Sequence, residues 1–194
     1  MENFTMNYTT ETIIKTIPVD RLGEFRDVEK FLTYCRECPN FGTRHSCPPH
    51  DIDDEKFLEK YTHAHFILTR IIYDDETILL SKGDKEKQNE ILYATREKVL
   101  REVEDQKLTK ELYSGGVSVS SSSCSLCKTC AKTENKPCRH PDKMRYAIDS
   151  FGFDITKIMT ELFGIGLSWP TDTIPEYQCL VGMFLDDDDN FFLD

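Results

Sequence analysis

The feature that most constrains this chain is a run of three cysteines at every third position, followed after seven residues by a fourth: Cys124, Cys127, Cys130 and Cys138. Steps of three bring successive side chains onto one concave turn of backbone, which can wrap a compact centre of several metal atoms. This spacing is typical of the ligands of iron–sulfur clusters. Zinc sites usually take cysteines as separated pairs. Residues 124–141 therefore predict a loop that binds a 4Fe-4S cluster, with a structural zinc site as the alternative.

A second cysteine-rich loop spans residues 35–50, where prolines and a glycine bar the backbone from continuing as helix. It holds Cys35, Cys38 and Cys47, with no obvious fourth thiol nearby. Candidates to complete this set are Cys179, Cys138, His45 and His50. In an apolar strand such as the one expected around Cys179, a free cysteine is more often a small core residue. If no protein ligand completes the set, one metal position stays open, as in catalytic sites.

Cys138 has two possible roles. It can complete the centre begun by the three regularly spaced cysteines. In two-cluster ferredoxins, however, the distant cysteine of such a run serves the other cluster. Arg139 and His140 follow Cys138 directly and are candidates to donate hydrogen bonds to cluster sulfur. The sequence therefore predicts one or two 4Fe-4S clusters.

Together the two cysteine groups resemble a family of uncharacterised prokaryotic "predicted metal-binding proteins", a cysteine-rich domain of unknown function. The resemblance runs from about Phe31 to the last expected strand. It rests on Cys35-x2-Cys38, Asn40-Phe41-Gly42, Cys47-Pro48-Pro49-His50 and the run from Cys124 to Pro141. The chain departs from the family at Ser122-Ser123, where the family tends to carry glycines. The resemblance implies cysteine ligation of a metal, with an iron–sulfur centre expected and no established reaction.

Length and charge narrow the class of protein. The chain has 194 residues, which suits a single domain over 1–194, and its formal net charge is -11. That charge argues against nucleic acid or an anionic membrane surface as a partner. It suits docking to a basic protein partner, such as a redox partner or an enzyme, although solubility explains it equally well. The oligomeric state is not assigned.

No secretory signal opens the sequence, and no apolar run is long enough to span a bilayer. We therefore expect a cytoplasmic protein, in which clustered thiols stay reduced and more often bind metal than form disulfides.

Hydrophobic periodicity predicts an α/β or α+β fold, with a small mixed sheet flanked by helices. Residues 1–10 are expected to be a ragged terminus, and residues 65–73 a strand that is buried on both faces. The expected strands are 12–17, 65–73, 117–120 and 177–185, and the expected helices 26–34, 53–61, 84–112, 143–151 and 154–163.

Three other patterns suggest chemistry that the sequence supports less well. His63 or His65 could activate a nucleophilic cysteine, but both more plausibly lie at the entry to a strand. The serines of residues 120–123 match no nucleotide-binding motif, and small residues there would let the backbone approach a cluster. The aspartates of residues 186–189 are expected to form a solvated tail rather than a cation site. The sequence identifies no catalytic residue.

The leading interpretation is an iron–sulfur protein for electron transfer, or an accessory to a redox or methyl-transfer enzyme. One alternative is an enzyme whose three-cysteine centre keeps an open iron and activates a small sulfur- or oxygen-containing substrate. A third is a zinc-stabilised binding module.

Overall fold

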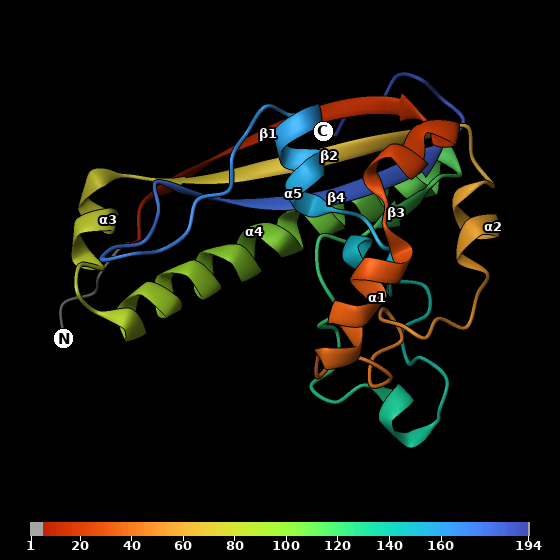
Figure 1. Ribbon diagram of the computed structural model, residues 1–194, viewed down its shortest axis with the longest axis horizontal. Coiled ribbons are helices and arrows are strands. Elements are labelled where there is room, and N and C mark those ends of the chain that lie inside the picture. The colour runs from red at the N-terminus through yellow and green to blue at the C-terminus, as the bar shows by residue number, and fades with distance from the viewer. Residues whose placement is uncertain (1–5, 194) are drawn as a thin grey trace.

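A computed structural model describes residues 6–193 as a four-stranded sheet with helices and loops on both faces (Figure 1). The strand order is β1-β2-β4-β3. The strands are β1 (Tyr8–Pro18), β2 (His63–Tyr73), β3 (Val117–Val119) and β4 (Tyr177–Asp186). The expected α+β class is confirmed. The sheet, however, is wholly antiparallel rather than mixed. Strand β2, for example, begins beside the end of β1, where Pro18 pairs with His63, so the two strands run in opposite directions.

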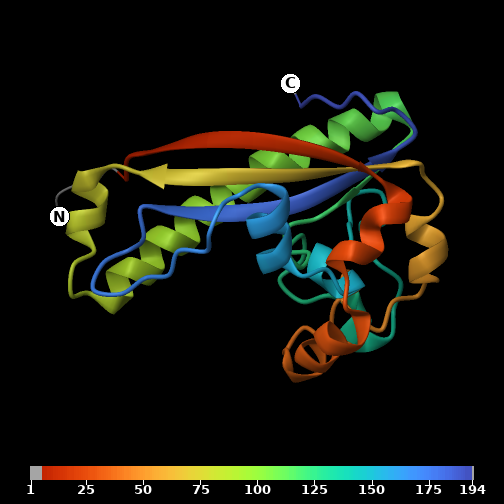
Figure 2. The ribbon, with the colours of Figure 1, turned by 45° about the horizontal axis from the view of Figure 1, so that its top comes forward.

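The remaining elements form a small lobe below one end of the sheet and a long arm along it (Figures 1 and 2). The α-helices are α1 (Val28–Glu37), α2 (Asp54–Leu58), α3 (Asp75–Leu80), α4 (Lys85–Ser114) and α5 (Ile155–Lys157). Shorter helical turns cover Val19–Phe25, Ala131–Glu134, Ile148–Phe151 and Ile158–Leu162. The lobe contains α1 and the segment between β3 and α5.

The central strand β2 is buried on both faces, as its apolar run predicted. Successive side chains of a strand point to opposite faces. Phe66 and Leu68 therefore pack with Phe151 and Phe153 from the lobe side. Ile71 lies on the other face and packs with residues of α4. Because both faces are covered, β2 holds the lobe and α4 on opposite sides of one rigid sheet.

Helix α4 has 30 residues and begins where Asp84 accepts a hydrogen bond from the backbone N–H of Lys87. It ends at Gly115, which adopts the left-handed conformation with φ 72°. One of its inward side chains is a fully buried lysine, Lys107, which forms an ion pair with Glu104 at 2.8 Å and donates to the Val119 carbonyl. Within residues 6–193, no helix combines the length and apolar character needed to cross a membrane.

The helix expected at 143–151 is wrong except for its last turn, Ile148–Phe151. The Ser120 N–H donates to the Tyr146 carbonyl at 2.8 Å, and the Ile148 N–H donates to the Ser120 carbonyl at 2.9 Å. The Ala147 N–H donates to the Ser46 carbonyl at 3.1 Å. These tertiary hydrogen bonds occupy the backbone groups that a helix would need.

Other boundaries differ less. Strand β1 begins at Tyr8, so the expected ragged terminus is wrong for residues 8–10, and residues 1–5 lie outside the described residues. Helix α1 extends to Glu37, which places Cys35 inside its last turn rather than after it. Helix α3 was not predicted.

Candidate metal centres

The first cysteine group forms where α1 ends. Cys35 lies in the last helical turn, and Cys38 caps the helix by donating its N–H to the Cys35 carbonyl at 3.0 Å. The loop then folds back, and the Gly42 N–H donates to the Pro48 carbonyl at 2.8 Å. This return brings Cys47 to the same cavity as Cys35 and Cys38.

The three thiols of this group lie close enough to interact electrostatically. Burial raises the pKa of Cys47 to about 11; the Ser46 hydroxyl lowers it, and Cys38, Cys35 and Asp149 raise it further. Burial is also the main cause of the raised pKa of Cys35. A buried thiol with a raised pKa stays protonated at neutral pH unless a cation such as a metal stabilises the thiolate.

The second group surrounds a much smaller space. Cys124, Cys127, Cys130 and Cys138 together line a pocket of about 10 Å³. Burial is the main cause of the raised pKa of Cys124, and the other three thiols raise it further. Cys138 therefore lies with the regularly spaced cysteines, and the backbone N–H of His140 donates to its Sγ at 3.4 Å. Arg139 donates instead to the Thr129 carbonyl.

Four soft sulfur donors around one small space, with an N–H aimed at one of them, are the kind of donor set that iron–sulfur centres and thiolate-bound zinc ions use. Within residues 6–193, no three His, Cys, Asp or Glu side chains meet closely enough to ligate a single metal ion. Four thiolates around one zinc ion would stand roughly 3.8 Å apart, given a Zn–S bond of about 2.3 Å.

The two groups lie against each other, because polar side chains of loop 35–50 hold the backbone of the second loop. Arg44 donates to the Cys124 carbonyl at 2.6 Å, and the Cys124 N–H donates to the buried Ser46 hydroxyl at 2.8 Å. Asn40 receives a hydrogen bond from Arg44 and donates to the Ser123 hydroxyl at 3.2 Å. Lys132 donates back to the carbonyls of the first loop.

The four candidates for a fourth ligand of the first group lie elsewhere. Cys138 belongs to the second pocket, and His45 lines that pocket as well. Cys179 lies on β4 opposite Arg70 and packs against the apolar core, where burial raises its pKa to about 11. His50 contacts Asp54 at 2.7 Å, and its buried Nε2 has no partner among the described residues.

Asp149 is a group at the first centre that no motif in the sequence predicts. It lines the cavity beside the three thiols and contributes to the raised pKa of both Cys35 and Cys47. Asp149 is exposed on the cavity surface, although protein atoms surround its carboxylate. This enclosure is the main cause of its raised pKa, which hydrogen bonds from the backbone N–H groups of Asp149 and Ser150, and then Arg96, partly offset.

The patterns that suggested other chemistry have structural roles. His65 is fully buried, and its ring nitrogens contact Thr16 and Asp186 at 2.8 Å. Asp186 is itself buried, so the expected solvated tail is wrong for this residue. His63 lines a surface pocket with the acidic run, and neither histidine lines a thiol cavity. Ser121, Ser122 and Ser123 line the first cavity, beside the thiols.

An antiparallel α+β domain that gathers seven thiols into two adjoining groups has the character of a metal-binding protein. The chain belongs to the family described as "Predicted metal-binding protein (DUF2284)", whose model matches residues 22–185. This match confirms the resemblance inferred from the cysteine groups. No curated protein and no solved structure matches the chain significantly.

Proposed function

We propose that the protein carries two iron–sulfur centres, one held by Cys124, Cys127, Cys130 and Cys138 and one by Cys35, Cys38 and Cys47. The observation that carries this proposal is the division of seven thiols into a set of four and a set of three, which the Ser46–Cys124 hydrogen bond joins. Such clusters supply one-electron transfer and, where an iron lacks a protein ligand, a Lewis-acid position.

The two sites suit different roles because they differ in openness. Within the described part of the chain, the second group encloses no space for a further small molecule beside its thiols, which suits a centre that only passes electrons. The first group faces a cavity of about 790 Å³, which suits a centre that also binds a small molecule. We therefore favour an enzyme in which the four-cysteine centre relays electrons and the three-cysteine centre activates a small sulfur- or oxygen-containing substrate.

The chain's own residues would shape the first centre. The Ser46 hydroxyl contacts the Cys47 sulfur at 3.7 Å, and the small residues Ser121, Ser122 and Ser123 line the same cavity as the thiols. Lys132 holds the Cys47 carbonyl at 3.3 Å and the Pro49 carbonyl at 2.6 Å. These contacts fix the loop, so the thiols would be held in place before a ligand arrives.

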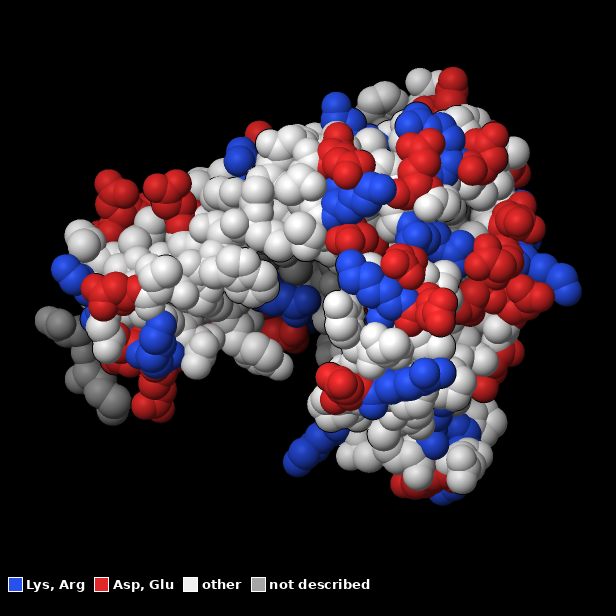
Figure 3. Space-filling model, viewed as in Figure 1, with Lys and Arg blue, Asp and Glu red and all other residues white. Residues whose placement is uncertain are grey.

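Electrons would come from a protein partner, either a redox protein or a larger enzyme to which this chain is an accessory. The formal net charge of -11 suits a basic partner. Acidic and basic side chains are nevertheless interspersed over the lobe in Figure 3, so this view contains no single acidic face. Docking near the four-cysteine centre would shorten the path for electrons.

Anaerobic purification followed by iron, sulfide and zinc analysis tests the proposal. We expect a brown protein with about eight irons and about eight sulfides per chain, as two cubane clusters require. Low-temperature electron paramagnetic resonance after reduction should show cluster signals. A colourless protein with stoichiometric zinc and no iron would contradict both redox roles and would favour the zinc-stabilised binding module.

A further inference from the structure

The cavity over the first cysteine group is formed by segments that lie far apart in the sequence. Helix α1 contributes Phe31 and Tyr34 to its lining, the serine run contributes Ser121, Ser122 and Ser123, and α4 contributes Arg96. The surface is hollowed between the sheet-and-α4 arm and the lobe (Figure 3). The volume of about 790 Å³ lies in the range of small-molecule sites, roughly 300–1,000 Å³.

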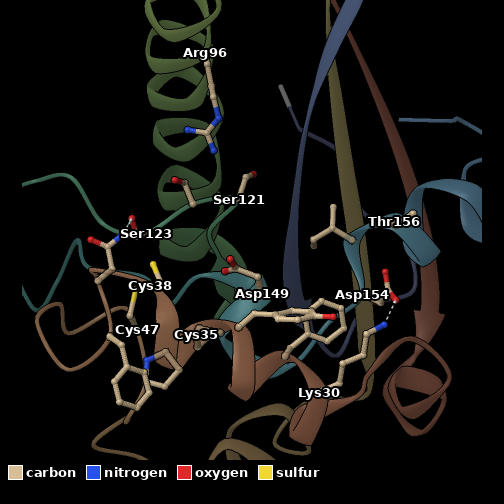
Figure 4. A pocket seen from close by; sticks show the side chains of 18 residues that line it. Lys30, Cys35, Cys38, Cys47, Arg96, Ser121, Ser123, Asp149, Asp154 and Thr156 are labelled. Atoms are coloured by element: carbon tan, nitrogen blue, oxygen red, sulfur yellow. Dashed lines mark hydrogen bonds and ion pairs between the residues drawn. The ribbon is translucent and has the colours of Figure 1, made fainter. Parts of the chain in front are cut away.

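The charges in this cavity are unevenly distributed. At one end Lys30 and Asp154 form an ion pair at 3.7 Å, so these two charges largely offset each other. Arg96 and Asp149 remain. Arg96 comes down from α4 and points its guanidinium into the cavity, whereas the Asp149 carboxylate lies near the thiols of Cys38 and Cys47 (Figure 4).

The guanidinium of Arg96 is suited to bind an anion. Its ion pair with Glu97 is long, at 3.9 Å, and about a third of the side chain is exposed. A guanidinium binds a carboxylate with two parallel hydrogen bonds, and a low-dielectric wall strengthens such bonds. Phe31 and Tyr34 supply apolar wall to the same cavity.

We propose that this cavity binds a small organic anion, whose carboxylate is held by Arg96 and whose thiol or hydroxyl is presented to the three-cysteine centre. This inference rests on the proposed function and names the substrate class of that site. Asp149 sets the orientation, because its negative charge repels a carboxylate from the thiol end and its oxygens accept a hydrogen bond from a neutral thiol or hydroxyl. The same charge, together with the thiolates, disfavours a phosphate, which carries more negative charge than one arginine balances.

The test uses 3-mercaptopropionate as the probe and 2-mercaptoethanol as a thiol of similar reach that lacks the carboxylate. Binding of each to the anaerobically purified full chain is measured by calorimetry, which detects binding whatever metal the thiols hold. We expect 3-mercaptopropionate to bind at least roughly tenfold more tightly, as a charged hydrogen-bonded pair predicts. Arg96→Gln should abolish the preference. Arg101→Gln, on the exposed side of the same helix and outside the cavity, should preserve it.

The outcomes separate this inference from the function on which it rests. Equal affinity for the two thiols, or a preference that survives Arg96→Gln, would overturn the anion site. Propionate that binds as tightly as 3-mercaptopropionate would overturn the role of the thiol end. Electron paramagnetic resonance of the same samples reports whether a cluster is present. A preparation without iron that still shows the Arg96-dependent preference would contradict the iron–sulfur function while supporting the anion site.

Discussion

The hydroxyl oxygen of Ser46 accepts a hydrogen bond from the backbone N–H of Cys124 at 2.8 Å, and Ser46 is fully buried. Ser46 precedes Cys47 of the first thiol group, and Cys124 begins the second. This short contact is one of those that join the two candidate centres, and it lies between residues 78 positions apart. Under the proposed function, centres joined in this way would exchange electrons directly, which is why we treat them as one functional unit.

Ser46→Ala tests this hydrogen bond between the two thiol groups. The substitution leaves the Cys124 N–H without its acceptor in a buried place, which costs about 1–3 kcal/mol. We expect a lower free energy of unfolding and reduced iron content in both centres, measured by urea denaturation and metal analysis. Ser125→Ala changes an exposed serine next to the same cysteine and should alter neither quantity measurably. Normal iron content in Ser46→Ala would contradict the coupling of the two sites.

Cys130→Ala and Cys179→Ala distinguish a metal ligand from a core cysteine. Cys130 lines the four-thiol pocket, whereas Cys179 packs on β4 against the apolar core. Loss of a ligand should remove about half of the iron in Cys130→Ala. Cys179→Ala should keep all of it. Iron analysis per chain measures both, and loss of iron in Cys179→Ala would show that this cysteine serves a centre after all.

The pKa of Glu111 predicts that part of the protein's stability depends on pH. Burial raises the pKa of its carboxyl, but hydrogen bonds from Arg145 and Ser118 outweigh that effect, so the pKa in the folded protein lies below its ordinary value. Its contribution to stability is therefore fully present above the unfolded pKa, about 4.3, and is lost as the pH falls through the lower folded value. Glu111→Gln should cost about 2 kcal/mol at pH 7 and progressively less towards pH 3.

Urea denaturation of wild type and Glu111→Gln at several pH values measures this difference. Glu134→Gln is the matched control, because Glu134 forms an exposed ion pair with Lys136. Such a surface pair contributes about 0–1 kcal/mol, so its loss should change stability little at any pH. A cost for Glu111→Gln that does not depend on pH would contradict the charge-based explanation.

Gly152→Ala tests the packing that positions α1 and therefore Cys35. Gly152 has φ 83°, and a Cβ added there would lie 2.6 Å from the backbone Cα of Val28 at the start of α1. Gly164 has a similar φ of 70°, but nothing lies within 4 Å of its added Cβ. Gly164→Ala should therefore cost only the backbone strain, about 1–2 kcal/mol. Gly152→Ala should cost about 1–3 kcal/mol more, because helix α1 must shift.

Thermal unfolding and the visible spectrum of the two variants measure this comparison. We expect Gly152→Ala to weaken iron binding at the first centre as well as stability, and Gly164→Ala to affect stability alone. Equal effects of the two substitutions on stability and on iron binding would contradict a role for Gly152 in positioning α1 and Cys35.

Local patterns in the sequence predicted much of this protein. The step of three between Cys124, Cys127 and Cys130 depends only on the geometry of a short turn, and the structure gathers these thiols around one pocket. The apolar run of β2 and the capping Asp84 of α4 are similarly local, and both elements formed where periodicity indicated. The failure at 143–151 also has a physical reason, since its backbone groups bond to Ser46 and Ser120 instead.

Tertiary structure decided what surrounds the thiols. Cys138 joins the second group because the turn at Ala131–Glu134 brings it back to Cys124. Arg96 and Asp149 reach the first cavity from opposite sides because the sheet holds α4 and the lobe in fixed positions. Spacing along the chain determines which thiols can share a metal centre. Packing across the sheet determines which charges face that centre, because those contacts arise only between elements that are distant in sequence.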